Sequence, residues 1–117
     1  MTKSVFEVER KIVVLGNSGT GKSTLIRNFI NGANLRVTVS DETIGAERYV
    51  KDVQVCTNPI FETTVKQRLQ VWDTSGQEKF RSISPLYYRD ADAFVLVYSI
   101  EDPKSFAAIE EYWLPSI

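Results

Sequence analysis

The sequence predicts a single α/β domain in which a mostly parallel sheet presents a phosphate-binding loop. Three observations predict this fold: a short apolar strand runs into a glycine-rich loop that opens a helix, a later strand ends in a carboxylate, and a second apolar strand precedes helix-start signals. A chain of 117 residues suits one domain. Its 43% apolar and 25% charged residues are typical of a folded globular protein.

The first predicted unit is a strand, a loop and a helix. Residues 11–15 are nearly all apolar and end at a glycine, a pattern typical of a central parallel strand buried on both faces. Residues 1–9 are expected to be a loose lead-in. A helix is predicted over Ser23–Asn31, with Gly32 placed to end it. Its apolar positions at helical spacing are Leu25, Ile26, Phe29 and Ile30.

The remaining elements alternate between strands and helices. Residues 35–45 show no sustained period and are expected to form a loop, whereas 49–55 and 65–72 alternate as two strands of a hairpin. Residues 94–100 form a second apolar run, hence another buried strand, and Pro103–Leu114 carries helix-start signals. This order implies parallel crossovers, with helices on both faces of the sheet.

Residues 16–23 match the phosphate-binding pattern G-x-x-x-x-G-K-[ST]. They are Gly16, Asn17, Ser18, Gly19, Thr20, Gly21, Lys22 and Ser23. The glycines let successive backbone N–H groups face one anion, and the following helix N-terminus adds partial positive charge. Lys22 can then reach the β- and γ-phosphates, while the Ser23 hydroxyl can bind Mg²⁺. The alternative, a turn that merely joins strand to helix, is disfavoured because both flanking elements are present.

A second candidate site begins where the second hairpin strand ends, at Asp73-Thr74-Ser75-Gly76. Open α/β sheets bind ligands at the carboxyl ends of their strands, so we expect Asp73 to hold Mg²⁺ through water. Gly76 follows at the spacing that a backbone N–H needs to meet a γ-phosphate. Thr43, in the loop after the first helix, could add a hydroxyl on the γ-phosphate side of Mg²⁺. On its own, a D-x-x-G pattern is better explained as a turn between a strand and a loop. Because it follows a phosphate-binding loop in this sequence, the interpretation as a ligand site is favoured.

Composition excludes several function classes. The formal net charge of -1 gives no field that would attract nucleic acid or anionic lipid. Cys56 is the only cysteine and histidine is absent, so a bound metal would have oxygen ligands. No apolar run approaches the ~18 to 20 residues that span a bilayer, and the N-terminus resembles neither a signal peptide nor a myristoylation site. We therefore expect a cytoplasmic protein.

Several segments together resemble the Rab branch of the Ras-like small GTPases, in the same order. The resemblance runs from Lys11 to the end of the chain and is carried by Gly16 to Ser23, Thr43-Ile44-Gly45, Trp72 to Ser82 (WDTSGQEKFRS), Tyr87 to Ala91 (YYRDA) and Val95 to Ile100 (VLVYSI). It implies a P-loop NTPase fold of the Ras-like type, three-layered, mostly parallel, with one antiparallel hairpin strand. Residues 1–117 would then be a partial small GTPase domain with switch I at about 35–45 and switch II at about 73–88.

The resemblance also implies a function. The chain would be a GTP-binding and GTP-hydrolysing switch in vesicle trafficking, using Mg²⁺ and cycling between GTP and GDP. Lys22, Ser23 and Thr24 would contact phosphates and Mg²⁺, and Gln77 would orient the attacking water. Effectors, exchange factors and GTPase-activating proteins would bind through the switch loops. Two alternatives stay open: Gln77 could be a solvated loop residue, and the aromatic residues near the switches could belong to the core instead of an effector face. Those aromatic residues are Trp72, Phe80, Tyr87 and Tyr88.

The sequence departs from the Rab pattern in three internal places. Thr43-Ile44-Gly45 is followed by Ala46-Glu47-Arg48, where Rabs usually place an aromatic residue. The connection between the hairpin strands, at 56–64, is longer than in the family. Residues 33–42 contain no aromatic side chain to lie against a guanine ring. These departures put effector choice and nucleotide affinity in question.

The largest departure is that the family's C-terminal part is missing. Its Asn-Lys-x-Asp and Ser-Ala-Lys segments, and a C-terminus that is often lipidated, do not occur before Ile117. We expect GTPase activity to need that part or a partner chain, and attachment to the cytosolic face of an endomembrane to need the lipidated end. The 94–100 strand would be left at an open edge, available for self-association. The alternative function is a pseudo-GTPase or P-loop interaction module without guanine specificity; an ATP-using enzyme ranks last, because no other catalytic constellation accompanies the loop.

Overall fold

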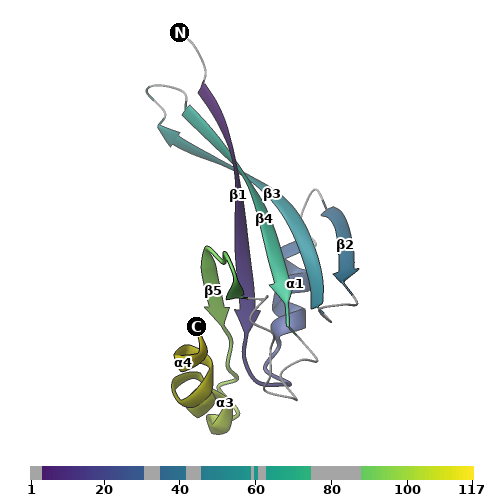
Figure 1. Cartoon of the computed structure of the whole chain (residues 1–117), viewed down its shortest axis with the longest axis vertical. Coiled ribbons are helices and arrows are strands. Elements are labelled where there is room, and N and C mark those ends of the chain that lie inside the picture. Colours follow the sequence, from purple (N-terminus) through teal and green to yellow (C-terminus); the bar gives the residue numbers. More distant parts are fainter. Residues whose placement is uncertain (1–3, 31–34, 42–45, 59, 61–62, 75–87) are drawn as a thin grey trace.

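The computed structural model describes residues 4–30, 35–41, 46–58, 60, 63–74 and 88–117 (Figure 1). These residues form an α/β unit in which strands and helices follow one another along the chain. The elements in order are β1 (Ser4–Leu15), α1 (Lys22–Ile30), β2 (Leu35–Asp41), β3 (Ala46–Asn58), β4 (Thr63–Asp73), β5 (Ala93–Leu96), α3 (Pro103–Ala108), the π-helical turn η2 (Ile109–Trp113) and α4 (Leu114–Ser116).

The five strands form one mixed sheet in the order β2-β3-β4-β1-β5. The central strand β1 runs parallel to β4 on one side and to β5 on the other. Beyond β4 the sheet is antiparallel, because β3 pairs with β4 as a hairpin and β2 pairs with β3. The predicted α/β sheet, with a central strand 11–15 and a hairpin, is therefore confirmed.

The core has two layers, one on each face of the sheet. Val13 and Trp72 face one side, where they pack with Ala108 and Trp113 of the α3–η2 segment. Their neighbours in sequence, such as Val14, face the other side and pack against α1. Successive residues of a strand point to opposite faces, so a strand covered by helices on both sides must be apolar throughout. This is the three-layer arrangement that the sequence predicts.

Two segments that were expected to be irregular are strands. Residues 4–10 belong to β1, because they continue its parallel register with β4 from the Ser4–Thr63 pair onwards. Residues 35–41 form β2, paired with β3, and the alternation of apolar and polar residues from Leu35 to Ser40 is a strand period that the expectation of a loop did not take into account. The long connection expected at 56–64 is also largely strand, since β3 runs to Asn58 and β4 begins at Thr63. In each case the segment pairs with a neighbouring strand, which fixes its extended conformation.

The last two predicted elements are shorter than expected. The strand at 94–100 is confirmed only as β5, because from Ser99 the chain turns: Asp102 donates its N–H to the Ser99 carbonyl at 3.1 Å. The helix begins as predicted, with the Asp102 side chain accepting from the Lys104 N–H and Pro103 at the first position. It does not run evenly to Leu114, because η2 interrupts it ahead of Pro115, which has no N–H to donate.

The sheet extends well past the helices. In Figure 1, β1, β3 and β4 continue above α1 as a long twisted ribbon that ends near the N-terminus. This ribbon accounts for the elongated shape, with extents of 54 × 30 × 25 Å. β5 lies at the opposite edge of the sheet, as expected, but the prediction that it is a buried strand is wrong, since Val95 is 39% exposed there. None of the helices in the part of the chain described above is long and apolar enough to cross a bilayer.

Candidate functional site: the loop between β1 and α1

The loop that joins β1 to α1 has the tight curl that the glycine pattern predicts. Gly16, Gly19 and Gly21 all have positive φ values, of 151°, 79° and 97°. At Gly16 a second constraint applies, because a Cβ atom there would lie 2.2 Å from the backbone carbonyl oxygen of Val97. The start of the loop therefore fits closely against the segment after β5, and only glycine satisfies both conditions.

Lys22 lies at the centre of this loop and is buried. Its side chain is 3% exposed, and its Nζ donates to the carbonyl oxygens of Gly16 and Asn17 at 2.8 and 2.7 Å. The Thr20 hydroxyl donates to the same Asn17 carbonyl at 2.8 Å. The loop thus folds around the positive charge of the Lys22 ammonium. The first turn of α1 presents its N–H groups at the same place. This combination suits an anion with several oxygens.

A pair of oxygen ligands lies beside the buried lysine. Asp73 is the last residue of β4 and is 4% exposed, and its Oδ2 accepts a hydrogen bond of 3.1 Å from the Ser23 hydroxyl. The parallel register places Asp73 opposite Val14, which brings the end of β4 next to the phosphate loop. Thus two residues that lie 50 positions apart in the sequence meet at one end of the sheet.

Thr74 fixes this end of the sheet, although the sequence analysis assigned it no role. It is fully buried, and its hydroxyl donates to the Val14 carbonyl at 2.7 Å. The bond ties the residue after Asp73 to the central strand, so the carboxylate cannot swing away without breaking it. The sequence feature that could have identified Thr74 is a small hydroxyl residue directly after Asp73.

The oxygen ligands fit Mg²⁺ better than other metals. No group of three or more His, Cys, Asp or Glu side chains comes together within the described ranges. Mg²⁺ needs no such group, because it is usually held by one or two carboxylates together with waters and phosphate oxygens. Asp73 and the Ser23 hydroxyl would hold it, and the ion would supply positive charge next to the phosphates.

The other predicted site residues divide into two groups. Ser18 and Thr24 are exposed, on the loop and on α1, where a ligand could reach them. Thr43, Gly76 and Gln77, together with Phe80 and Tyr87, lie outside the described residues. The predicted switch I and switch II segments are therefore described only in part.

Trp72 and Tyr88 belong to the core. Trp72 is 9% exposed, and Tyr88 packs partly buried against the same cluster, with its ring 5.9 Å from that of Phe94. Burial, together with the neighbouring Tyr112, raises the pKa of the Tyr88 hydroxyl above its ordinary value. For these two aromatic residues the core interpretation is the better one.

Two cations lie near the Trp72 ring. Lys11 Nζ is 4.5 Å from the ring centroid, and the Arg48 guanidinium carbon is 5.7 Å from it. Lys11 also donates to the Arg89 carbonyl at 2.8 Å. Desolvation lowers the pKa of the Lys11 ammonium, partly offset by the carboxylate of Asp90. Arg48, the third residue after the Thr-Ile-Gly segment, thus places a cation close to Trp72.

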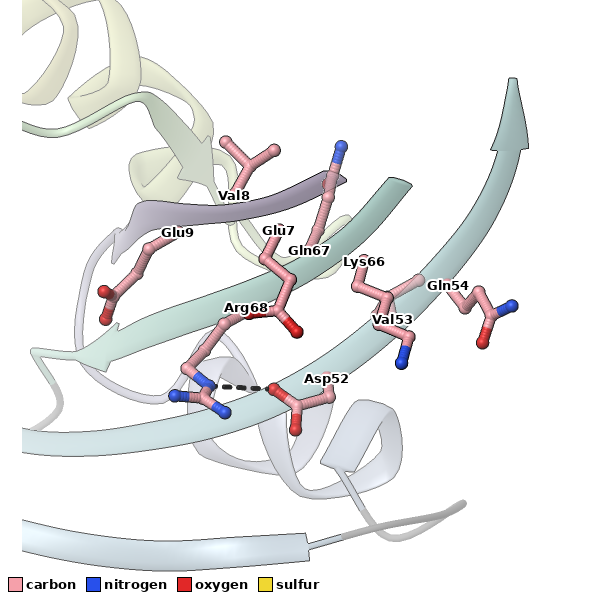
Figure 2. A pocket seen from close by; sticks show the side chains of 9 residues that line it. All are labelled: Glu7, Val8, Glu9, Asp52, Val53, Gln54, Lys66, Gln67 and Arg68. Carbon is pink, nitrogen blue, oxygen red and sulfur yellow. Dashed lines mark hydrogen bonds and ion pairs between the residues drawn. The ribbon is translucent and has the colours of Figure 1, made fainter. Parts of the chain in front are cut away.

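A hollow of about 470 Å³ elsewhere on the sheet is not part of this site. It lies on the ribbon where β1, β3 and β4 extend past the helices, and Figure 2 shows its charged side chains. Arg68 Nε is 3.1 Å from the Asp52 carboxylate on the neighbouring strand, and Glu9 on the other side stands in register with Arg68. These carboxylates raise the pKa of the Arg68 guanidinium. Cross-strand pairing accounts for the charged side chains along this hollow, so they do not indicate a ligand site.

Comparison with known proteins agrees with this geometry. The family described as "Ras: Ras family" matches residues 11–117. The chain is 43% identical over 107 residues to the Ras-related protein Rab-1 of Theileria annulata, covering 92% of this chain and 44% of that protein. It is 42% identical over 107 residues to human Ras-related protein Rab-30, covering 92% and 48%. With bovine Ras-related protein Rab-26 it shares 39% identity over 112 residues, covering 96% and 40%.

The chain thus spans slightly less than half the length of these relatives. The matched region includes the phosphate loop, β4 with its terminal Asp73, and the α3–η2 segment. The chain therefore belongs to the Ras family, and within it the chain is Rab-like.

Proposed function

We propose that this chain supplies the phosphate-binding and Mg²⁺-binding half of a GTP-dependent switch. Lys22 and the loop backbone bind the β- and γ-phosphates, and Asp73 and Ser23 hold Mg²⁺ beside them. The observation that carries this proposal is the meeting of a buried lysine with a hydroxyl–carboxylate pair at the mouth of one glycine-rich loop. A phosphate group gives Lys22 stronger acceptors than the two carbonyls that it contacts now.

The hydrolysis step is assigned to residues beyond the described part of the site. Gln77 orients the attacking water, and Thr43 and Gly76 contact the γ-phosphate side, so that loss of this phosphate releases both loops. Effectors and regulators recognise the two loops in their bound form. The whole protein acts in vesicle trafficking on an endomembrane surface.

The alternative, an interaction module that no longer binds nucleotide, is less well supported. Such a protein would have no reason to keep Lys22 buried among carbonyl groups, since burying a charge is costly unless the site uses it. The same holds for Asp73, which is 4% exposed.

The metal requirement tests the proposal. Titration of the chain with GDP by calorimetry, with and without Mg²⁺, should show binding that the metal strengthens. Asp73→Asn should remove most of the Mg²⁺ effect, because the amide cannot offer a negative charge to the cation. Asp52→Asn, on the exposed ribbon, is the matched control and should keep it. An Asp73→Asn protein with an unchanged Mg²⁺ effect would refute the assignment.

A further inference from the structure

The phosphate loop is tied to the helical segment on the α3 side of the sheet by one side-chain hydrogen bond. The Trp113 indole Nε1–H donates to the Asn17 Oδ1 at 2.9 Å. The two residues lie 96 positions apart, and they bring together the last residue of η2 and the second residue of the loop. Neither the phosphate chemistry nor the core packing described above accounts for this contact.

Trp113 is held too firmly to be an accidental partner. It is 1% exposed and packs in the cluster of Val13, Leu15 and Trp72, under the central strand. Its ring meets that of Tyr112 edge-on at 4.8 Å. The π-helical turn that ends at Trp113 changes the direction of its side chain relative to a regular helix, and single π turns often occur where a helix serves a site.

Asn17 is the residue through which this bond can act on the ligand. Its backbone carbonyl accepts from Lys22 Nζ at 2.7 Å and from the Thr20 hydroxyl at 2.8 Å, while its side chain accepts from Trp113. One residue therefore joins the buried ammonium to the buried indole. If the side chain lost its anchor, the peptide group after Asn17 could rotate, and the Lys22 ammonium would lose its fixed position.

We propose that Trp113 is a positioning residue that sets the affinity of the phosphate loop through Asn17. The inference rests on the proposed function, because it concerns the same phosphate site. Coupling of this kind is reciprocal: a bound phosphate group strengthens the Trp113–Asn17 bond, and a partner that shifts the α3–η2 segment weakens phosphate binding.

A double-mutant cycle on Mg²⁺–GDP affinity tests the proposal. Trp113→Phe keeps an aromatic ring but removes the donor, and Asn17→Ala removes the acceptor; each should weaken binding about tenfold, the equivalent of one lost hydrogen bond. The double variant should be no weaker than either single one. Asn17 lies in the loop, outside both core clusters, so Asn17→Ala tests the same bond even if Trp113→Phe folds poorly. Glu110→Ala, at an exposed position of the same η2 turn, is the matched control and should leave the affinity unchanged.

A spectroscopic readout separates positioning from simple packing. In the ¹H–¹⁵N spectrum of the chain, the Trp113 indole resonance should shift on addition of GDP and Mg²⁺ and should move again in Asn17→Ala. Equal affinities for wild type and both single variants would overturn the inference alone, as would an effect of Trp113→Phe that persists fully in the Asn17→Ala background. Absence of any GDP binding by the wild-type chain would overturn the proposed function, and the inference with it.

Discussion

Replacing Lys22 by alanine should almost abolish binding of nucleotide phosphates. In the structure the Lys22 Nζ donates hydrogen bonds to the Gly16 and Asn17 carbonyls, at 2.8 and 2.7 Å. When phosphate oxygens take over as acceptors, both partners of each bond are charged, and each bond is worth about 1.5–3 kcal/mol. Two such bonds amount to roughly 3–6 kcal/mol, which corresponds to a loss of about 10² to 10⁴ in affinity.

The same substitution also has a predictable effect on the protein without ligand. Asn17 keeps the Thr20 hydroxyl as a donor to its carbonyl, whereas the Gly16 carbonyl loses Lys22, in a buried part of the loop. Leaving a buried acceptor without this donor costs about 1–3 kcal/mol. Removing the buried ammonium also removes the desolvation cost of a buried charge, which offsets part of this loss. The free energy of unfolding should therefore fall by less than the free energy of nucleotide binding.

Calorimetry with Mg²⁺–GDP and urea unfolding measure these two effects. Lys51→Ala is the matched control, because Lys51 also donates to a backbone carbonyl, that of Phe29, but lies on the exposed surface of the sheet. It should bind nucleotide like the wild type. If Lys22→Ala bound Mg²⁺–GDP as tightly as Lys51→Ala does, the assignment of the loop as a phosphate site would be refuted.

Three further substitutions have expected outcomes. Gln77→Leu should keep nucleotide binding but slow single-turnover hydrolysis, because leucine cannot hydrogen-bond the attacking water; equal rates would make Gln77 a bystander. Gly16→Ala should destabilise the fold by about 2 kcal/mol or more in urea, since its Cβ would lie 2.2 Å from the Val97 carbonyl oxygen; unchanged stability would contradict the close fit. Ser105→Ala should cost about 1–3 kcal/mol, because the buried hydroxyl accepts from the Ser99 N–H and donates to the Asp102 carbonyl; a cost near zero would mean that the turn before α3 finds other partners.

The phosphate loop was predictable because its chemistry is local. The glycines, the lysine and the hydroxyl all lie within eight consecutive residues between a strand and a helix, so sequence order alone brings them together. The Asp73 position followed from a general rule on the carboxyl ends of parallel strands, and the structure places it next to Ser23. The apolar run at 11–15 was equally informative, because a strand covered on both faces must be apolar throughout. The run at 94–100 was not, because β5 ends at Leu96 and its Val95 is 39% exposed.

What could not be predicted depends on contacts between distant segments. The first part of β1 is a strand because β4 pairs with it in parallel register. Of the four apolar α1 residues at helical spacing, Ile26 and Ile30 are buried against Val14 and Val71, whereas Leu25 and Phe29 are exposed. The Trp113–Asn17 bond joins residues 96 positions apart, through a π turn that helical periodicity does not reveal.

The most direct measurement of the central claim is the affinity of the chain for GMP, GDP and GTP in the presence of Mg²⁺. If the loop around Lys22 is a phosphate site, binding must strengthen sharply from GMP to GDP, because only the second nucleotide carries the β-phosphate that the ammonium and the loop N–H groups contact. The account predicts a gain of at least about 100-fold for that one phosphate, in line with two charge-assisted hydrogen bonds. Equal affinities for GMP and GDP would contradict it.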